Sequence, residues 1–378
     1  MNIFFYLIFF LFSLGQLGRV TLLSGQVNFY LYEPIMAIIF VLLIFRHKLA
    51  PVSSGFKKLR FVYAFNLFLL FSYLFGVFGY QPLQNLVAAL FLARLVFYQA
   101  FFLYLYFYLK HSKSIIEFKK GFYFSLVLIT ISSLVQHFLY PDLRNLIYQG
   151  WDPHLNRLFG VFFDTGLAAS FYGLVAIYFY RRKNIFATIV FMTFLILTFS
   201  RSAYLFFILT LGYDFLRTRN LKVAAMALVL FVSIFSFVPK EFGVGVGLGR
   251  VFSIASRFED YGKAYEIFKK APVVGYGYNR IEFVKQKMIP SAHNRLDIPD
   301  HSAAAFSSSF LVILVTSGLV GLVLFAASIY QLAAFRNLQL YFIFISLMSL
   351  SDNIILHPFI LFGLGSMGMI SLLYGKSR

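Results

Sequence analysis

Residues 302–329 have the sequence SAAAFSSSFLVILVTSGLVGLVLFAASI, in which no side chain carries a charge. An α-helix needs about 20 predominantly apolar residues to cross the hydrocarbon core of a bilayer, and this run is long enough. It lacks the regular alternation of apolar and polar residues that is typical of a strand in a membrane barrel. Because backbone in lipid must satisfy its own hydrogen bonds, the run predicts a transmembrane helix.

Similar runs recur along the whole chain, in which 60% of residues are hydrophobic. We therefore expect an all-α polytopic transmembrane helix bundle of about 12 spans, formed as a single integral membrane domain by residues 1–378. The alternative for the last two spans is a single segment that is bent near Pro358. The first run has no basic residue before it and no small-residue cleavage site, which predicts a retained first helix. The predicted spans lie near residues 3–18, 29–45, 61–80, 83–109, 121–140, 158–180, 185–199, 202–216, 223–238, 302–329, 338–354 and 355–374.

The formal net charge of +19 could suggest a nucleic-acid partner, but its distribution indicates membrane topology. More than half of the 33 Lys and Arg residues fall in short segments between or after the apolar runs. By the positive-inside rule these segments and both termini are cytoplasmic, which leaves the links at 141–157 and 239–300 outside. We expect no nucleic-acid partner. The basic segments are residues 46–60, 110–120, 181–183 and 217–222, Arg336, and the tail with Lys376 and Arg378.

The chain contains no cysteine, which excludes disulfides, iron–sulfur clusters and thiol zinc sites and leaves the redox compartment undetermined. Its scattered His and carboxylate residues show no metal-ligand spacing. We expect no metal and no cofactor.

Charged residues inside the apolar runs cost about 2.5 to 3.5 kcal/mol each on insertion scales, so each needs a partner or a role. Arg94, Asp164, Arg201 and Asp352 are the prominent examples. A structural ion pair of Arg94 with Asp352 or Asp164 is the simplest interpretation. Arg201 differs because it lies in Phe199-Ser-Arg-Ser-Ala203, a predicted tight turn on the same side as the 239–300 link, and it is a candidate functional residue.

The 239–300 link is a large polar outer loop, and we expect the active site there. It begins with a glycine-rich segment, residues 243–249, followed by Arg250. Glycine-rich backbone can bind phosphate, but no Lys-Ser/Thr follows, so this is not a nucleotide-binding P-loop; a flexible loop is the alternative. The spacing of Ser256 and Glu259 predicts a capping box that opens an amphipathic helix on the membrane surface, which Pro272 ends.

Within that loop, Arg257 at the predicted helix N-terminus suits binding of a pyrophosphate group. The alternative is an ion pair of Arg257 with Glu259 or Asp260. Tyr276 and Tyr278 follow in a turn and could stack on sugars or anchor the loop at the membrane interface. After them, Asn279 with Glu282 predicts a second short helix that ends before Pro290.

The loop closes with His293, Asp300 and His301. Transfer to a hydroxyl group is helped by a base that titrates near neutral pH, and histidine supplies one. Asp300 could orient a neighbouring imidazole. An idle surface histidine is the alternative in each case.

Several motifs, taken in order, resemble those of the O-antigen polymerase and O-antigen ligase superfamily of bacterial membrane glycosyltransferases. Arg157-Leu-Phe-Gly160 with Asp164, and Phe199-Ser-Arg-Ser-Ala-Tyr204, resemble its motifs in the middle spans. Arg257-Phe-Glu-Asp-Tyr261 and Pro272-Val-Val-Gly-Tyr-Gly277 resemble its loop pattern, and Thr316-Ser-Gly318-Leu-Val-Gly321 resembles the following helix. The resemblance covers residues 155–325. The chain has Ser307-Ser-Ser309 where the family often has a His-Asn pair.

The resemblance implies a metal-independent glycosyltransferase of the bacterial cytoplasmic (inner) membrane that uses a polyprenyl-diphosphate-linked glycan. On that basis Arg201 and Arg257 bind the diphosphate and stabilise the leaving group, and His301 activates the acceptor. The expected partners are this lipid-linked glycan and membrane lipid. A chain-length regulator protein is a further candidate partner. Further substrate-binding candidates are Arg157, Arg250, Tyr261, Tyr276 and Tyr278.

Three functions remain open besides polymerisation of lipid-linked repeats for a surface polysaccharide. A ligase would pass the glycan to lipid A core or to protein. A glycolipid flippase or other transporter would only bind the headgroup; it would need polar residues through the depth of the bundle, and we find no paired broken-helix repeat. A structural membrane partner is the third alternative. The departure at Ser307-Ser-Ser309 favours polymerase over ligase.

Overall fold

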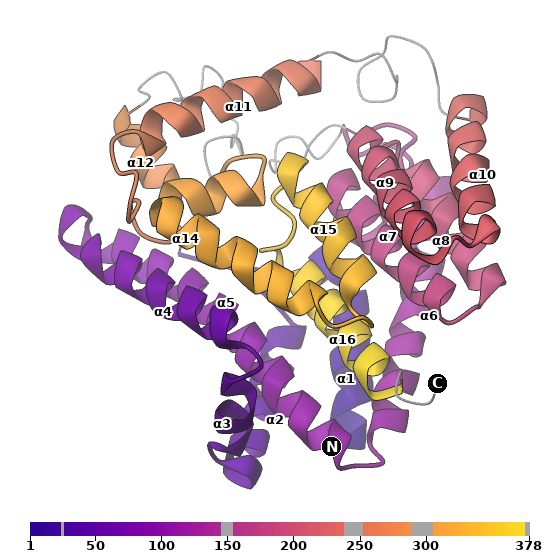
Figure 1. Ribbon diagram of the computed structural model, residues 1–378, viewed down its shortest axis with the longest axis horizontal. Coiled ribbons are helices and arrows are strands. Elements are labelled where there is room, and N and C mark those ends of the chain that lie inside the picture. The colour runs from indigo at the N-terminus through magenta and orange to yellow at the C-terminus, as the bar shows by residue number, and fades with distance from the viewer. Residues whose placement is uncertain (24–25, 145–153, 238–251, 289–304, 375–378) are drawn as a thin grey trace.

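The computed structural model describes the whole chain except residues 24–25, 145–153, 238–251, 289–304 and 375–378 (Figure 1). The described residues form mainly α-helices. Those in the first half of the chain are α1 Asn2–Ser13, α2 Tyr32–His47, α3 Ala50–Phe56, α4 Arg60–Phe75, α5 Pro82–Lys110, α6 Ile115–Leu139 and α7 Thr165–Arg181. The second half contributes α8 Ile185–Leu197, α9 Arg201–Thr218, α10 Leu221–Phe237, α11 Phe252–Phe268, α12 Ile281–Met288, α14 Ser309–Ala333, α15 Gln339–Ser351 and α16 Pro358–Tyr374.

Each predicted apolar run overlaps with one of these helices, which confirms the all-α prediction for the main part of the fold. By length and composition, four described helices could cross a membrane: α5, α6, α14, and α4 with its extension to Gly79. The pair α2 and α3 passes the same test together but is bent by 86°. Because the other apolar helices are shorter, the predicted 12 spans and their topology stay predictions.

A small β-hairpin interrupts the helices near the start of the chain, where the sequence predicted none. Strands β1 Arg19–Leu22 and β2 Val27–Tyr30 pair antiparallel, with Arg19 opposite Tyr30. The described residues also form three 3₁₀ turns, η1 Gly15–Gly18, η2 Val77–Gly79 and η4 Gly160–Phe162.

Helix α7 forms the centre of the bundle. Every residue from Leu167 to Tyr178 is buried, and the helix packs against α8, α9, α15 and α16. A helix that is apolar on all sides is typical of a position surrounded by other helices. At Gly173 the ring of Phe344 occupies the space that a Cβ atom would need, so glycine permits the close approach of α15.

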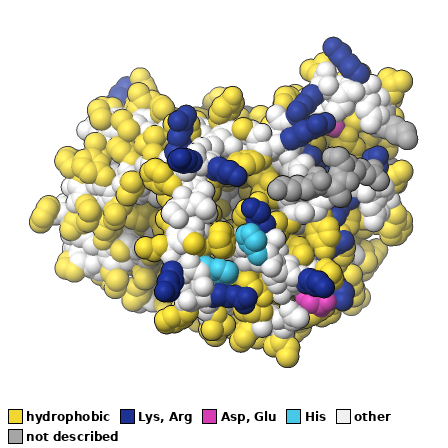
Figure 2. Space-filling model, turned by 60° about the horizontal axis from the view of Figure 1, so that its bottom comes forward, with side chains coloured by type: hydrophobic (Ala, Val, Ile, Leu, Met, Phe, Trp, Pro, Cys, Tyr) yellow, Lys and Arg dark blue, Asp and Glu magenta, His cyan; other side chains and the backbone are white. Residues whose placement is uncertain are grey.

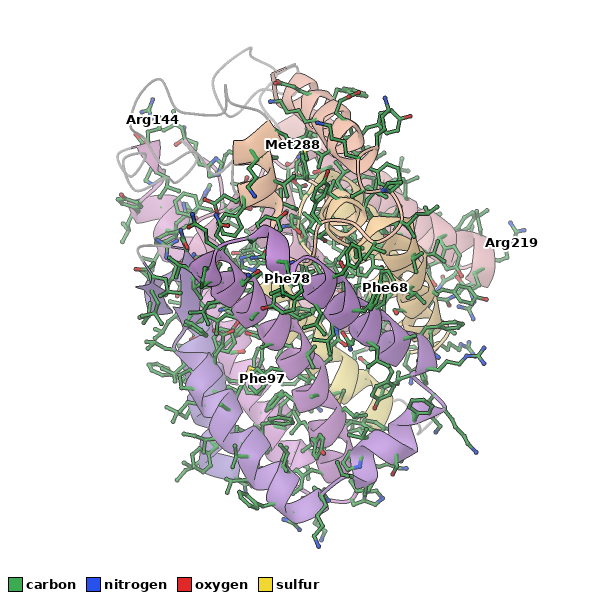
Figure 3. The ribbon with its side chains drawn as sticks, turned by 90° about the vertical axis from the view of Figure 1, so that its left-hand side faces the viewer. Phe68, Phe78, Phe97, Arg144, Arg219 and Met288 are labelled. Carbon is green, nitrogen blue, oxygen red and sulfur yellow. The ribbon has the colours of Figure 1, made fainter. Side chains whose placement is uncertain are left out.

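Helix α11 lies along one end of the bundle, and the start of α1 and the end of α16 lie toward the other end (Figure 1). Figure 3 shows Arg144, in the link after α6, on the same upper side as Met288 at the end of α12. Phe97, in α5, lies toward the opposite side in that view. The described parts of the two predicted outer links therefore share one end of the molecule.

Arg94 forms an ion pair, as predicted, but the predicted partners Asp352 and Asp164 are wrong. Arg94 binds Glu33 of α2 through two bonds of 2.6 Å, and it donates a third bond to the backbone oxygen of Asn28. Tyr98 also donates to Glu33, at 2.8 Å. Since α2 and α5 pack side by side, a partner far earlier in the sequence lies closer than Asp164 or Asp352.

Candidate functional site

Two of the glycine motifs meet where the outer loop joins the bundle. The helical conformation of α14 breaks at Gly318, which has φ 65° and ψ −168°. The break frees helix carbonyl groups, and the loop supplies donors: Tyr276 N binds Val315 O at 3.2 Å, and Gly277 N binds Thr316 O at 2.8 Å. In a membrane environment, freed backbone groups need such partners. We call this contact between residues 272–277 and 315–319 the clasp.

Glycine is required at the clasp because the two backbones touch. A Cβ atom on Gly318 would overlap the carbonyl oxygen of Val273, and one on Gly275 would lie 2.5 Å from Ser317 N. Both glycines also have positive φ, which side-chain-bearing residues rarely adopt. Ser72 of α4 adds two bonds of 2.9 Å, to the carbonyl oxygens of Val274 and Thr316. The clasp thereby holds the segment after α11 against α4 and α14.

Arg280 fixes the turn that follows the clasp by binding groups of α4 and α5. Its side chain is fully buried and donates to Tyr73 O at 3.0 Å and to Asn85 Oδ1 at 2.7 Å. The guanidinium also lies over the rings of Tyr73 and Tyr80, at 4.7 and 4.8 Å. Burial lowers the pKa of Arg280, and the groups that contact its guanidinium, in Tyr73, Tyr80 and Asn85, are neutral. The sequence did not single out this residue.

The start of α11 differs from the prediction. The helix begins at Phe252, so Ser256 and Glu259 lie inside it and not at its N-terminus. The pairing of Arg257 with Glu259 or Asp260 is also wrong, because Glu259 binds Lys263 at 2.6 Å and Asp260 faces Lys285 at 3.8 Å. The amphipathic helix itself and its end before Pro272 are confirmed, as is the second short helix, α12, which ends before Pro290.

Arg257 instead forms an ion pair with Asp352, which directly follows α15. The Nη2 atom lies 2.9 Å from Asp352 Oδ1, and the two side chains are 33% and 22% exposed. A partly exposed pair can exchange one partner for a ligand at modest cost, since exposed ion pairs contribute only about 0 to 1 kcal/mol. Because both side chains are partly exposed, a ligand can reach them.

Asp352 lies beside the N-terminal turns of two helices, α9 and α7. Its Oδ2 accepts bonds from Ser202 of α9 at 3.2 Å and from Ser351 at 2.9 Å. A Cβ atom added at Gly166 in α7 would lie 3.6 Å from the carboxyl carbon of Asp352 and 3.3 Å from Asp164 Oδ1. Free N–H groups at helix N-termini favour anions. The sequence marked both residues as charges within apolar runs and Asp164 also as part of a motif, but it did not place either beside Arg257.

The serine run at the start of α14 faces the same region. Ser309 donates to Asn353 Oδ1 at 3.0 Å, and Ser308 donates to Ser349 O at 2.9 Å. The backbone N–H of Ser307 donates to Asp260 Oδ2 at 2.9 Å, which ties α14 to α11. The serines thus occupy structural contacts with α11, α15 and the residue after Asp352.

Arg201 is the first residue of α9, next to Ser202, which donates to the same carboxylate that Arg257 pairs with, and the positive charge of Arg257 acts on the Arg201 guanidinium. Two guanidinium groups near one another favour a ligand with more than one negative charge. Arg201, Ser202, Arg257, Asp352 and Asn353 are here called the arginine–aspartate site.

Arg157 holds the backbone turn that precedes Arg201 in this site. It is 4% exposed and donates to Thr198 O at 2.9 Å and to Phe199 O at 3.2 Å. These carbonyl groups end α8, and Phe199 has φ 51° in the turn that leads to Arg201. The backbone N–H of Leu158 adds a bond to Leu197 O at 2.9 Å. The guanidinium of Arg157 is thus used to shape the turn that presents Arg201.

The predicted tyrosines lie in different environments. Tyr261 is 41% exposed and donates to Leu350 O at 2.6 Å, beside the arginine–aspartate site. Tyr276 is half-buried in the clasp, and burial raises its pKa. Tyr278 is only 6% exposed and packs in the main core, which leaves no open face for a sugar.

His301, Arg250, His293, Asp300 and the glycine-rich segment 243–249 lie outside the described residues. Among the residues that the structure does describe, no group of three His, Asp or Glu side chains could hold a metal ion. The metal-independent reaction and the role of His301 stay predictions.

Comparison with known proteins supports the resemblance that the motifs indicated. The family model described as O-antigen ligase matches residues 185–326, from the start of α8 into α14. The matched segment contains Arg201, Arg257 and both sides of the clasp. No curated protein matches the chain in sequence. The family match and the apolar helices together indicate a multi-pass membrane protein with an O-antigen ligase or polymerase type of function.

Proposed function

We propose, from the premise that residues 185–326 match the O-antigen ligase family, that the protein transfers a glycan from a polyprenyl-diphosphate carrier to an acceptor hydroxyl group. The reaction takes place at the outer face of the bacterial cytoplasmic membrane. The observation that carries the proposal is the partly exposed Arg257–Asp352 pair with Arg201 beside it, at the N-terminus of α9.

Arg201 and Arg257 bind the diphosphate in this proposal. The acceptor oxygen forms a bond to the anomeric carbon of the donor sugar, and the bond from that carbon to the diphosphate oxygen breaks. Polyprenyl diphosphate leaves with the electron pair, and the guanidinium groups stabilise its added charge. Preorganised donors of this kind are often worth about 3 to 4 kcal/mol each.

The hydroxyl proton needs an acceptor, and two residues are candidates. His301 is the sequence-based candidate. Asp352 is the candidate that the described site favours, because its carboxylate is released from Arg257 when the diphosphate takes over that guanidinium. Arg157 supports the reaction by holding the turn before Arg201. No metal or cofactor enters the proposed reaction.

Polymerisation is our first proposal, because Ser307-Ser-Ser309 departs from the family's His-Asn pair, and a chain-length regulator protein would then be a partner. Ligation to lipid A core or protein is the second candidate, favoured by the description of the matching family. A transporter is disfavoured because Arg201, Arg257 and Asp352 gather at one end of the bundle.

Reconstitution tests the proposal. The purified protein in lipid vesicles is given a polyprenyl-diphosphate oligosaccharide from the host strain, and products are analysed by gel and mass spectrometry. A ladder of repeat multiples that Arg257→Ala abolishes supports the polymerase. A product only after addition of a separate acceptor supports the ligase, and no product with any acceptor contradicts glycosyl transfer. Adding EDTA to the assay tests metal independence.

The same assay separates the two candidate bases. Loss of activity in His301→Ala with retention in Asp352→Asn would assign the proton to His301. The opposite result would assign it to Asp352. Arg144→Ala, on the same end of the molecule but in an exposed pair with Asp142, is the matched control.

A further inference from the structure

A long apolar groove lies between α3, α4, α5, α14 and α16 and takes no part in the proposed reaction. Its volume is about 400 Å³. Side chains such as Phe65, Phe102, Leu103, Ile329, Leu364 and Leu372 form its walls. No acidic side chain lines it among the described residues. Walls of this composition suit a hydrocarbon chain.

The charges of the groove lie at one end only. Lys58 follows α3, and Lys110 is the last residue of α5; both line the groove. Ser54 lies beside them on α3. The opposite end is formed by Ile355 and Leu356, soon after Asp352. In the part of the chain that the structure describes, neither lysine forms an ion pair with a carboxylate.

Helix α3 shapes the charged end. It is bent by 86° from α2 and packs against α4 and α5. Tyr104 of α5 holds the bend by donating to Lys48 O at 2.6 Å, and Gly55 allows Leu103 to approach α3 closely. Figure 2 shows this end of the molecule, where Lys and Arg side chains are spread among hydrophobic ones and acidic side chains are few.

The length of the groove fits one leaflet. It follows α5 from Leu95 to Lys110, which is roughly 22 Å along the helix at 1.5 Å per residue. One leaflet together with its headgroup layer is about 20 to 22 Å thick, which this length matches. The lysines then lie at the level of the lipid headgroups on the side that the sequence predicts to be cytoplasmic.

We propose that this groove binds an anionic phospholipid of the cytoplasmic leaflet, with its headgroup at Lys58 and Lys110 and an acyl chain along α5. Basic pockets between transmembrane helices on that side are typical sites for anionic headgroups. The two lysines lie at the end of the groove opposite to Ile355 and Leu356, which follow Asp352. This position favours an anionic phospholipid over the lipid tail of a glycan donor. A donor with its diphosphate at Arg257 would leave the two lysines without an anion.

Native mass spectrometry of the full-length protein tests the proposal, with dioleoyl phosphatidylglycerol and dioleoyl phosphatidylcholine as probes. We expect the wild-type protein to retain one phosphatidylglycerol. The double variant K58E/K110E should reduce this retention at least about tenfold. The matched control is K57E/K113E, which makes the same change at two nearby lysines that do not line the groove, and retention should change less than twofold.

A second variant addresses the apolar part of the site. Val62→Trp fills the groove while it keeps both lysines, and it should also reduce retention of phosphatidylglycerol. Thermal unfolding in detergent shows that each variant is folded. Equal retention of phosphatidylcholine, equal loss in the control pair, or a retained polyprenyl lipid in place of phospholipid would overturn the proposal.

Discussion

The guanidinium of Arg257 lies 2.9 Å from the carboxylate of Asp352, a residue 95 positions later in the chain. Arg257 lies inside α11, above the bundle, whereas Asp352 ends α15 within it. The pair therefore joins the outer loop to the transmembrane helices at the point where Arg201 begins α9. Its position makes it both a contact between elements and a charged site open to a ligand.

Removal of Arg257 should affect activity much more than stability. Because the pair is partly exposed, Arg257→Ala should change the free energy of unfolding by no more than about 1 kcal/mol. Glycosyl transfer should fall about 100-fold or more, since a transition-state donor is lost. The charge swap R257D/D352R restores the pair but not the diphosphate site. Recovery of activity in the swap would show that the pair is only structural.

Arg157 should act through the turn before Arg201. Arg157→Lys removes the bonds to Thr198 O and Phe199 O, and the cost of leaving buried groups unpaired is about 1 to 3 kcal/mol. We expect a lower melting temperature together with weaker binding of the lipid-linked donor. Arg144→Ala should change neither quantity. A variant of Arg157 with normal stability and no activity would indicate direct contact with the diphosphate instead.

Substitution at the clasp should separate α11 and α12 from α14. Gly318→Ala introduces a Cβ that overlaps Val273 O and forces a positive φ on alanine, which costs about 1 to 3 kcal/mol. Gly262→Ala is the matched control, because its Cβ meets no atom within 4 Å on the exposed side of α11. That change should stabilise the helix by about 0.5 to 1 kcal/mol. Thermal unfolding in detergent measures both variants, and equal effects would contradict the clasp.

Arg280→Ala should loosen the turn between α11 and α12. The substitution leaves Asn85 and the carbonyl group of Tyr73 without their donor inside the protein, at a cost of about 1 to 3 kcal/mol. Limited proteolysis should then cut faster in residues 269–281. Lys287→Ala provides the control, because Lys287 also lies over Tyr80 but is exposed. Equal protection of wild type and Arg280→Ala would exclude the locking role.

The buried pair of Glu33 and Arg94 should show strong coupling. Removal of one partner, as in Arg94→Met, leaves a buried charge and should cost about 3 to 5 kcal/mol. The double variant E33L/R94M removes both charges and should be much less destabilised than the sum of the two single changes. A double-mutant cycle of unfolding free energies measures this difference, and additive effects would contradict it.

The sequence by itself determined where the helices lie, because the length and apolarity of a run are local properties. It also located α11, α12 and the motifs that contain Arg201 and Arg257. It misplaced the start of α11. The helix begins at Phe252, four residues before Ser256, which was expected to open it. The capping-box pattern is local, and such a pattern is compatible with a helix interior.

Tertiary structure alone decided which residues meet. Arg94 pairs with Glu33 and Arg257 with Asp352, although the sequence offered several carboxylates to each. Gly275 lies against Thr316 and Ser317, and Gly318 against Val273, for the same reason, in a contact that no local pattern encodes. An ion pair or a backbone contact depends on distances of a few ångströms, and those distances are set by how the helices pack.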